Sequence, residues 1–500
     1  MLSLVKDYQK LIALILVITV FLISIVDNVG FWHDEFYTLG LLRGFDIYLF
    51  PGSDLIKSGV YSSTYIHEFL AFDSFWVNLK RNLIHEGHPP LYYLILRVWT
   101  NLFGVHEFGL RSFSIALFAT TIYVSYQVGL ALNLKRRLLL PILVSVTPVL
   151  NLYALEARSY SMYYLFSMLS LLFCIKFLLG NSHDSSKSKL RALTYFIVFS
   201  TLLIYTHYYG VFFYGILSIT IALNLFSRRD FKQILMLIFP LLLFLPWTPF
   251  ILHQMSAHSE HWTDGYLGFG ASFYYYIVGF FTLCHVSISS PFSYLSFIAI
   301  IGVIVNCRKW IVSHAKDVIM VVGLFLFYGV MIITFDKILD HHTISVPRYY
   351  LPIHAFFVTA LALLIDKGKL RWLANLVVVL LIAVCGMAVI ELIHNGGRQK
   401  QMCQEVASYI NSNLDPEKTE LVVIPNGPTA VGISYYLPRK YEIRTVPLDE
   451  VCDAYNYEDV VVIEQRLGLS CEAWNLSCKT NQIDARTIRF VGIDVVKGDE

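Results

Sequence analysis

Long apolar runs separated by short polar loops recur along the first 393 residues of the chain. A helix needs about 20 apolar residues to cross the hydrocarbon core of a bilayer. About thirteen segments meet or approach this length, and the pattern predicts about 11–13 membrane helices. The segments are Leu11–Val29, Pro90–Phe103, Arg111–Leu132, Leu138–Tyr153, Tyr160–Leu179, Leu193–Tyr205, Val211–Phe226, Ile234–Leu252, Phe273–Ser289, Tyr294–Val305, Val318–Phe335, Tyr349–Ile365 and Trp372–Ile393.

Basic residues concentrate in alternate loops of this predicted bundle. Positively charged loops stay in the cytoplasm, so the N-terminus is expected there and the chain after the last span outside. This assignment holds only if Pro90–Phe103 and Phe273–Ser289 do not both cross the bilayer fully. The basic loops contain Lys135-Arg136-Arg137, residues 181–191, Arg228-Arg229, Arg308-Lys309 and Lys367–Arg371.

The first outward loop, residues 30–89, is long and departs from the apolar pattern. Its second half, residues 61–86, mixes aromatic and charged side chains at roughly helical spacing. That composition is typical of helices that lie in the plane of the membrane interface.

The pattern changes again after His394. ELVVIP, DVVVIEQR and RTIRFVGIDVV read as strands, and Gln399–Asn413 reads as an amphipathic helix. We therefore expect a transmembrane domain over residues 1–394 and a small extracytoplasmic α/β domain over residues 395–500.

Composition narrows the class of protein. Of 500 residues, 56% are hydrophobic and 15% charged, and the mean hydropathy is +0.59. Soluble proteins carry about 25% charged residues, so a mainly α, polytopic membrane protein is indicated. The net charge of +2 comes with no basic run suited to nucleic acid.

Four of the eight cysteines fall in the last hundred residues. Disulfides are expected among them if this domain faces an oxidising space, and buried unpaired thiols are the alternative. They are Cys403, Cys452, Cys471 and Cys478.

Two adjacent carboxylates, Asp34 and Glu35, follow the first span directly, with His33 beside them. Ionisable groups near membrane depth are costly and tend to be functional. The alternative is a solvated helix end.

Arg158 and Arg348 each open an apolar run on the outward side, and each is followed within two residues by tyrosine, Tyr160 and Tyr349 respectively. A guanidinium group donates several hydrogen bonds without losing its charge, which suits a phosphate at the membrane surface. A single such arginine would indicate only snorkelling. The pair favours a phosphate-binding site.

Histidines supply the remaining candidates for a substrate pocket. His88 stands before Pro89-Pro90, which can start a helix but cannot sit inside one. His207 and Tyr208 lie in YTHYYG, and His261 and Trp262 lie in the outward loop that follows. Together with the carboxylates they could ligate a divalent metal, for which the candidates are Asp34, Glu35, His88 and His261. Their spacing matches no zinc motif.

These elements resemble those of the polytopic GT-C glycosyltransferases, in particular the protein mannosyltransferase and aminoarabinose transferase branch. The matching stretches occur in the family's order over roughly residues 1–365. They are HDEFYTLG, HPPLYYLILRVWTNLFG, EFGLRSFSIAL, EARSYSMYYL, THYYG, PWTPFILHQ and PRYYLPIHA.

The resemblance implies an inverting transfer of a sugar from a polyprenyl-phosphate donor to an extracytoplasmic glycan, lipid or protein. It implies that Asp34 is the general base or a metal ligand, supported by Glu35, and it leaves open whether a divalent metal is the cofactor. Membrane lipids are the surrounding partners, and the expected location is a bacterial or archaeal plasma membrane.

One departure from the family's pattern bears on the product. Glu86-Gly87-His88 precedes the proline pair, where the aminoarabinose transferases carry acidic and basic residues. This difference argues against lipid A aminoarabinose as the product. A transporter or flippase of lipid-linked sugars is the alternative function, although its charges would be expected near the bilayer midplane.

Overall fold

The structure is a computed structural model of the whole chain. It describes residues 2–26, 30–31, 33–44, 59–64, 66, 75–180, 186–257, 265–281, 291–417, 420–424, 428–438, 440–445, 460–465, 487–491 and 494–497. The chain forms two compact units. Unit 1 comprises Met1–Val26 and Gly87–Ile393, and unit 2 comprises Asp27–Glu86 and His394–Glu500.

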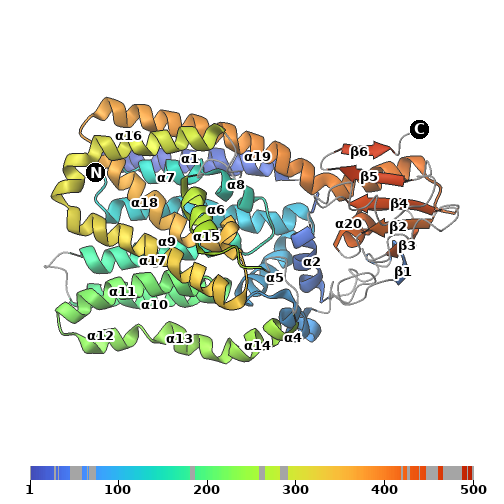
Figure 1. Ribbon diagram of the computed structural model, residues 1–500, viewed down its shortest axis with the longest axis horizontal. Helices are drawn as coiled ribbons and strands as arrows, with labels where there is room; N and C mark the ends of the chain where they lie inside the picture. Colours follow the sequence, from blue (N-terminus) through green and yellow to red (C-terminus); the bar gives the residue numbers. More distant parts are fainter. Residues whose placement is uncertain are drawn as a thin grey trace. The chain divides into compact units, whose positions relative to one another are not determined.

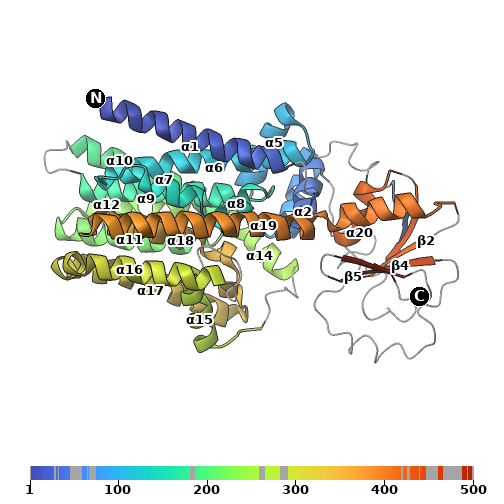
Figure 2. The same cartoon turned by 90° about the horizontal axis from the view of Figure 1, so that it is seen from above.

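Unit 1 is a bundle of helices that run mostly lengthwise and side by side (Figures 1 and 2). In its first half lie α1 (Leu2–Val26), α5 (Leu91–Phe103), α6 (Glu107–Ala131), α7 (Leu139–Ser145), α8 (Pro148–Ala154), α9 (Tyr160–Leu179), α10 (Ser186–Thr206) and α11 (Gly210–Ser227). In its second half lie α12 (Phe231–Met236), α13 (Phe239–Phe244), η2 (Leu245–Trp247), α14 (Thr248–Ala257), α15 (Phe269–Phe281), α16 (Pro291–Ser313), α17 (Ala315–Leu339), η3 (Thr343–Ser345), η4 (Pro347–Tyr350), α18 (Leu351–Lys367) and the start of α19 (Arg371–Asn413).

Eight helical segments of the described chain are long and apolar enough to cross a membrane. These eight segments indicate a multi-pass membrane protein, as the sequence predicts. Several of the other expected spans form shorter helices. Thr147 precedes Pro148 and adopts an extended backbone, which divides the expected span Leu138–Tyr153 into α7 and α8. The segment Pro90–Phe103 forms α5, which has 13 residues.

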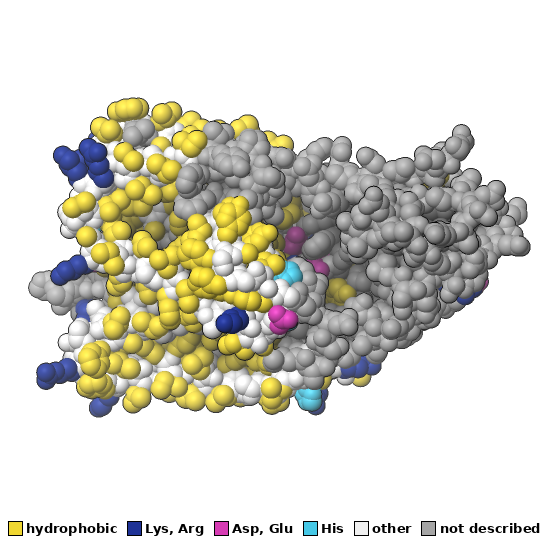
Figure 3. Space-filling model, viewed as in Figure 1, with side chains coloured by type: hydrophobic (Ala, Val, Ile, Leu, Met, Phe, Trp, Pro, Cys, Tyr) yellow, Lys and Arg dark blue, Asp and Glu magenta, His cyan; other side chains and the backbone are white. Residues whose placement is uncertain are grey.

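Hydrophobic side chains cover the visible face of unit 1, and Lys and Arg collect most clearly at one end (Figure 3). That end also carries the N-terminus (Figure 1). The basic loops of the sequence include Arg136 and Arg137 between α6 and α7. Arg137 Nη1 lies 3.2 Å from Asp7 Oδ2 of α1, so this loop is tied to the first helix.

The middle of unit 1 is built around α9, which packs between α6 and α10 and also contacts α11 and α18. Two buried serines of this helix show how polar groups are satisfied locally or by a neighbour. The Ser167 hydroxyl donates to the carbonyl of Tyr163, and the Ser200 hydroxyl of α10 donates to Ser170 at 3.3 Å. Such pairing is required wherever polar groups lie at membrane depth.

A close crossing of α15 and α17 gives a first prediction. A Cβ atom on Gly329 of α17 would overlap the ring of the buried Tyr276 of α15, whereas one on Gly323 of the same helix meets nothing within 4 Å. We expect Gly329→Ala to lower the free energy of unfolding by about 1–3 kcal/mol, because the crowded ring must shift.

Gly323→Ala is the matched control. It changes the same helix in the same way and should leave stability unchanged or slightly raised, since alanine favours a helix over glycine by about 1 kcal/mol. Thermal unfolding of the two purified variants in detergent compares them. Equal melting temperatures would contradict the close crossing.

Unit 2 combines the segment that follows α1, Asp27–Glu86, with the C-terminal region, His394–Glu500. Its helices are α2 (His33–Arg43), α4 (Phe75–Glu86), the end of α19 and α20 (Pro428–Tyr436). Its strands are β1 (Gly59–Ser62), β2 (Glu420–Ile424), β3 (Glu442–Thr445), β4 (Val460–Gln465), β5 (Thr487–Val491) and β6 (Asp494–Lys497).

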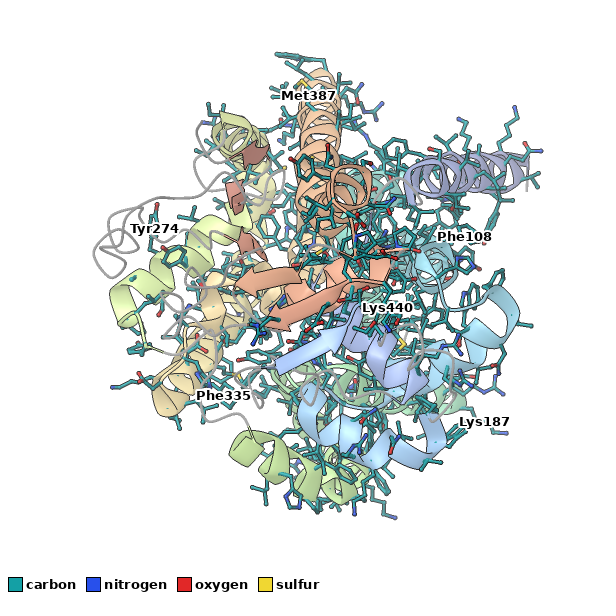
Figure 4. All side chains as sticks on the ribbon, turned by 90° about the vertical axis from the view of Figure 1, so that its right-hand side faces the viewer. Phe108, Lys187, Tyr274, Phe335, Met387 and Lys440 are labelled. Atoms are coloured by element: carbon teal, nitrogen blue, oxygen red, sulfur yellow. The ribbon has the colours of Figure 1, made fainter. Side chains whose placement is uncertain are left out.

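The strands form one mixed sheet in the order β1-β3-β2-β4-β5-β6. The four central strands are parallel, and β1 and β6 are antiparallel at the two edges. Figure 4 shows Lys440, which precedes β3, beside these strands. The sequence predicts β2 and β4 correctly. RTIRFVGIDVV, expected as one strand, forms the two antiparallel strands β5 and β6, and β3 was not predicted. It does not predict that the first outward loop supplies an edge strand to the C-terminal sheet.

Candidate functional site

Arg158 lies in the short turn between α8 and α9 of unit 1. It is buried, with 4% of its side chain exposed, and its Nη1 donates to Tyr93 Oη of α5 at 3.4 Å. The turn itself is anchored because the Ser114 hydroxyl of α6 donates to the carbonyl of Glu156 at 2.6 Å. The guanidinium group is therefore held at the end of a helix that lies at the centre of the bundle.

Arg348 lies in η4, directly before α18. Pro347 holds the preceding Val346 in an extended conformation, so the chain turns at this point. The guanidinium carbon lies 5.7 Å from the ring centre of Tyr160 and 5.5 Å from that of Tyr349. These are cation–π distances, and they keep Arg348 at the start of α9. The structure thus brings together the second arginine and both tyrosines that the sequence singles out.

His207 lies between α10 and α11 and is 3% exposed. Its ring stacks on Tyr163 with centroids 4.6 Å apart, and it meets the rings of His88 at 5.6 Å and Tyr349 at 5.8 Å edge to face. Burial lowers the pKa of His207 well below its usual value, and the nearby His88, Arg348 and Arg158 lower it further. His207 is therefore neutral at pH 7 and lies within electrostatic reach of both arginines.

The tautomer of His207 follows from its backbone contact. The N–H of Tyr209 donates to His207 Nδ1 at 3.3 Å, so the ring proton of the neutral imidazole lies on Nε2. Among the described residues this buried Nε2 has no hydrogen-bond partner. A donor of this kind near two guanidinium groups is suited to an anionic oxygen.

His88 is held by a chain of side chains from the second half of unit 1. Its carbonyl oxygen accepts from Gln254 Nε2 at 3.5 Å, and Gln254 Oε1 accepts from Tyr208 Oη at 2.5 Å. The Trp247 indole donates to the same Tyr208 oxygen at 2.8 Å. Burial raises the pKa of Tyr208 to about 12, so this phenol remains a donor to Gln254.

A second chain of hydrogen bonds fixes the segment before Arg348. Tyr209 Oη and Thr343 Oγ1 are 2.7 Å apart, and Thr343 Oγ1 donates to Asp336 Oδ1 at 2.5 Å. The N–H of Ile344 donates to Asp336 Oδ2 at 2.9 Å. The ring of Tyr209 lies 4.8 Å from that of Tyr349, next to Arg348. The loop that contains His207 and the loop that contains Arg348 are thereby joined.

The carboxylate pair lies in unit 2, in the first turn of α2. Asp34 is partly exposed and Glu35 is fully buried. Negative charge is favourable at a helix N-terminus, because the backbone N–H groups there are unpaired and the helix dipole is positive. The start of α2 is thus a favourable position for acidic side chains.

Three predicted residues fall outside this description. The structure does not describe the side chain of His33, nor the segment 258–264 that contains His261 and Trp262. Within the described ones no three His, Cys, Asp or Glu side chains are grouped closely enough to hold a metal ion. The metal candidates Asp34, Glu35, His88 and His261 therefore stay a prediction. Among the cysteines, Cys403 is buried, and Cys452, Cys471 and Cys478 lie outside the described residues.

Sequence reasoning missed the residues that support the cluster. Tyr93, Gln254 and Trp247 lie in stretches that carry the family resemblance, but no charge marks them as site residues. Tyr93 lies in the first turn of α5, after the proline pair that follows His88, so no helical spacing links the two residues. Thr343 and Asp336 contact the site through a loop, which no periodicity reveals.

The bundle and the appended α/β unit define a polytopic membrane protein with the GT-C fold, and comparison with solved structures confirms this fold. The crystal structure of ArnT from Cupriavidus metallidurans in the apo state matches with a TM-score of 0.56 and 12% sequence identity, covering 95% of this chain and 94% of that chain. ArnT from the same organism bound to undecaprenyl phosphate matches with a TM-score of 0.52 and 12% identity, covering 92% and 86%. No protein-family model and no curated protein matches the chain.

Proposed function

We propose that this protein is an integral-membrane, inverting glycosyltransferase. It moves a sugar from a polyprenyl-phosphate donor to a glycan, lipid or protein outside the cytoplasm. The observation that carries the proposal is the cluster of Arg158, Arg348 and neutral His207 at the helix ends of unit 1. The binding of undecaprenyl phosphate by ArnT, which shares the fold, supports the donor class.

The arginine cluster suits a lipid phosphate for an electrostatic reason. Two guanidinium groups that both act on one buried imidazole repel each other, and burial strengthens that repulsion. A bound phosphate would neutralise this charge and accept hydrogen bonds from Arg158, Arg348 and the Nε2–H of His207. The aromatic rings of Tyr160 and Tyr349 hold the guanidinium of Arg348 in place for that contact.

Asp34 is the proposed general base. The acceptor hydroxyl oxygen attacks the anomeric carbon of the sugar, and its proton passes to the Asp34 carboxylate. The bond between that carbon and the phosphate oxygen breaks, and the polyprenyl phosphate leaves with the electron pair. A single displacement inverts the anomeric configuration. Cations at the leaving phosphate stabilise the charge that develops there.

The expected topology is consistent with this chemistry. The basic loops gather at the end that carries the N-terminus, as expected of the cytoplasmic side. Arg158, His207 and Arg348 belong to the loops of opposite parity, so the proposed reaction takes place outside the cytoplasm. A plasma or inner membrane is the proposed location.

His207 gives a prediction of its own. His207→Phe keeps a ring against Tyr163 but removes the Nε2–H donor, and we expect it to raise the KM for the lipid donor about tenfold or more. His207→Gln offers an amide N–H at similar reach and should stay within a few-fold of the wild type. Equal KM values for the two variants would show that the imidazole has only a packing role.

The reaction itself is tested by incubating the purified protein with a panel of polyprenyl-phosphate sugars and candidate acceptors. Mass spectrometry should find an acceptor enlarged by one sugar together with released polyprenyl phosphate. Transport of intact donor across proteoliposomes, without cleavage of any panel member, would instead favour the transporter alternative.

A further inference from the structure

The carboxylates of the first outward loop are held by the C-terminal domain. Strand β1 of that loop pairs antiparallel with β3, with Gly59 opposite Thr445 and Ser62 opposite Glu442. The pairing continues beyond the strand, because the N–H of Ser63 donates to the carbonyl of Tyr441 at 2.8 Å. The N–H of Tyr441 donates to Ser63 Oγ at the same distance. Loop and domain thus form one folded unit.

Helix α2, which bears Asp34 and Glu35, also contacts the C-terminal domain directly, through α20. The backbone N–H of Phe31, just before α2, donates to Tyr436 Oη at the end of α20 at 2.6 Å. The rings of Phe31, Phe36 and Tyr435 lie 5.7 Å from one another in each pair. Phe31 and Phe36 are both 0% exposed, so two residues flanking the carboxylate pair are inserted against α20.

The approach of α20 is so close that only glycine fits at one position. A Cβ atom on Gly432 would lie 2.8 Å from Phe36 Cε2 and 2.7 Å from Cys403 Sγ of α19. A Cβ atom on Gly30 would lie 3.0 Å from Tyr436 Oη. The contact between α2 and α20 therefore depends on residues of both segments. Glycines allow the close approach, and aromatic side chains fill the space between the helices.

We propose that the C-terminal α/β domain is a positioning element for the carboxylate helix, and that Tyr436 is its positioning residue. The inference rests on the proposed role of Asp34. An isolated helix of 11 residues is marginal in water, so α2 needs tertiary contacts to hold its first turn. A carboxylate displaced by about 1 Å from its working position can lose about a hundredfold in rate.

The test compares two Tyr→Phe variants of the full chain. Tyr436→Phe removes the acceptor of the Phe31 N–H and keeps the ring. Tyr441→Phe is the matched control: its phenol donates to the carbonyl of Leu414 at 3.1 Å, within the same domain. We expect Tyr436→Phe to lower kcat about tenfold with little change in the KM of the lipid donor or in binding of undecaprenyl phosphate. Tyr441→Phe should keep kcat within about twofold of the wild type.

Asp34→Asn measured alongside separates this inference from the proposed function. If Asp34→Asn is inactive while Tyr436→Phe matches the wild type, the positioning role is wrong and the proposed function stands. If Asp34→Asn still transfers sugar, Asp34 is not the general base and the inference built on it fails, whereas a wild type that transfers no sugar would contradict the proposed function. An equal loss of kcat in Tyr436→Phe and Tyr441→Phe would overturn the inference, because it would reduce Tyr436 to general support of the domain.

Discussion

Replacing Asp34 with asparagine is expected to lower kcat about a thousandfold, because the acceptor hydroxyl loses the group that takes its proton. General bases contribute about 10²–10⁴-fold to catalysed reactions. The amide has almost the shape of the carboxylate and should leave folding, expression and binding of undecaprenyl phosphate unchanged. Initial rates with saturating donor, together with thermal unfolding of the same preparation, measure both quantities.

Asp230→Asn is the control for this substitution. Asp230 caps α12, where its Oδ1 accepts from the N–H of Gln233 at 3.2 Å. Asparagine caps a helix as well as aspartate does, so this variant should keep full activity. An Asp34→Asn protein that transfers sugar at more than about a tenth of the wild-type rate would contradict a general base at this position.

Arg348→Ala is the second change with a large expected effect. Arg348 is half-buried in the free protein, and the bound lipid phosphate would desolvate it further. Truncating one partner of a desolvated charge pair costs about 2–5 kcal/mol, so we expect kcat/KM to fall at least about a hundredfold. Arg348→Lys should recover only part of this loss, because an ammonium group cannot form the planar two-point contact or stack between Tyr160 and Tyr349 in the same way. Steady-state kinetics with varied lipid donor measure the effect.

Arg137→Ala provides the comparison for the arginine variants. Arg137 pairs with Asp7 on the basic side of the bundle, and both side chains are about one third exposed. Exposed ion pairs contribute about 0–1 kcal/mol, so this variant should remain close to the wild type. If Arg348→Ala resembled Arg137→Ala, the arginine would serve only to anchor the helix end, and the phosphate-binding role would be wrong.

Much of the fold could be predicted because membrane helices and buried strands consist of long apolar runs, which are visible in the sequence. The runs at Tyr160–Leu179 and ELVVIP became α9 and β2 with little change at their ends. Pro89-Pro90 placed the start of α5 correctly, whereas the division of Leu138–Tyr153 at Pro148 was not predicted. The strand β1 was missed because GVYS has four residues and carries no alternation that periodicity could detect.

The candidate site could be predicted only in part, since charge marks some of its residues and nothing local marks the rest. Arg158, Arg348 and His207 attract notice because ionisable groups are rare among apolar segments. The Tyr436 hydroxyl accepts a hydrogen bond from the backbone N–H of Phe31, which lies 405 residues earlier in the chain. No sequence pattern in either segment predicts that bond. The neutral state of His207 depends on burial and on His88, Arg348 and Arg158 from distant loops, which is a property of the folded chain.

A structure of the protein with undecaprenyl phosphate bound is the most direct test of the account. The phosphate should lie within hydrogen-bonding distance of Arg158, Arg348 and His207 Nε2, with the Asp34 carboxylate facing the same cavity. A lipid phosphate bound elsewhere, with Asp34 opening onto a different cavity, would contradict the proposed active site.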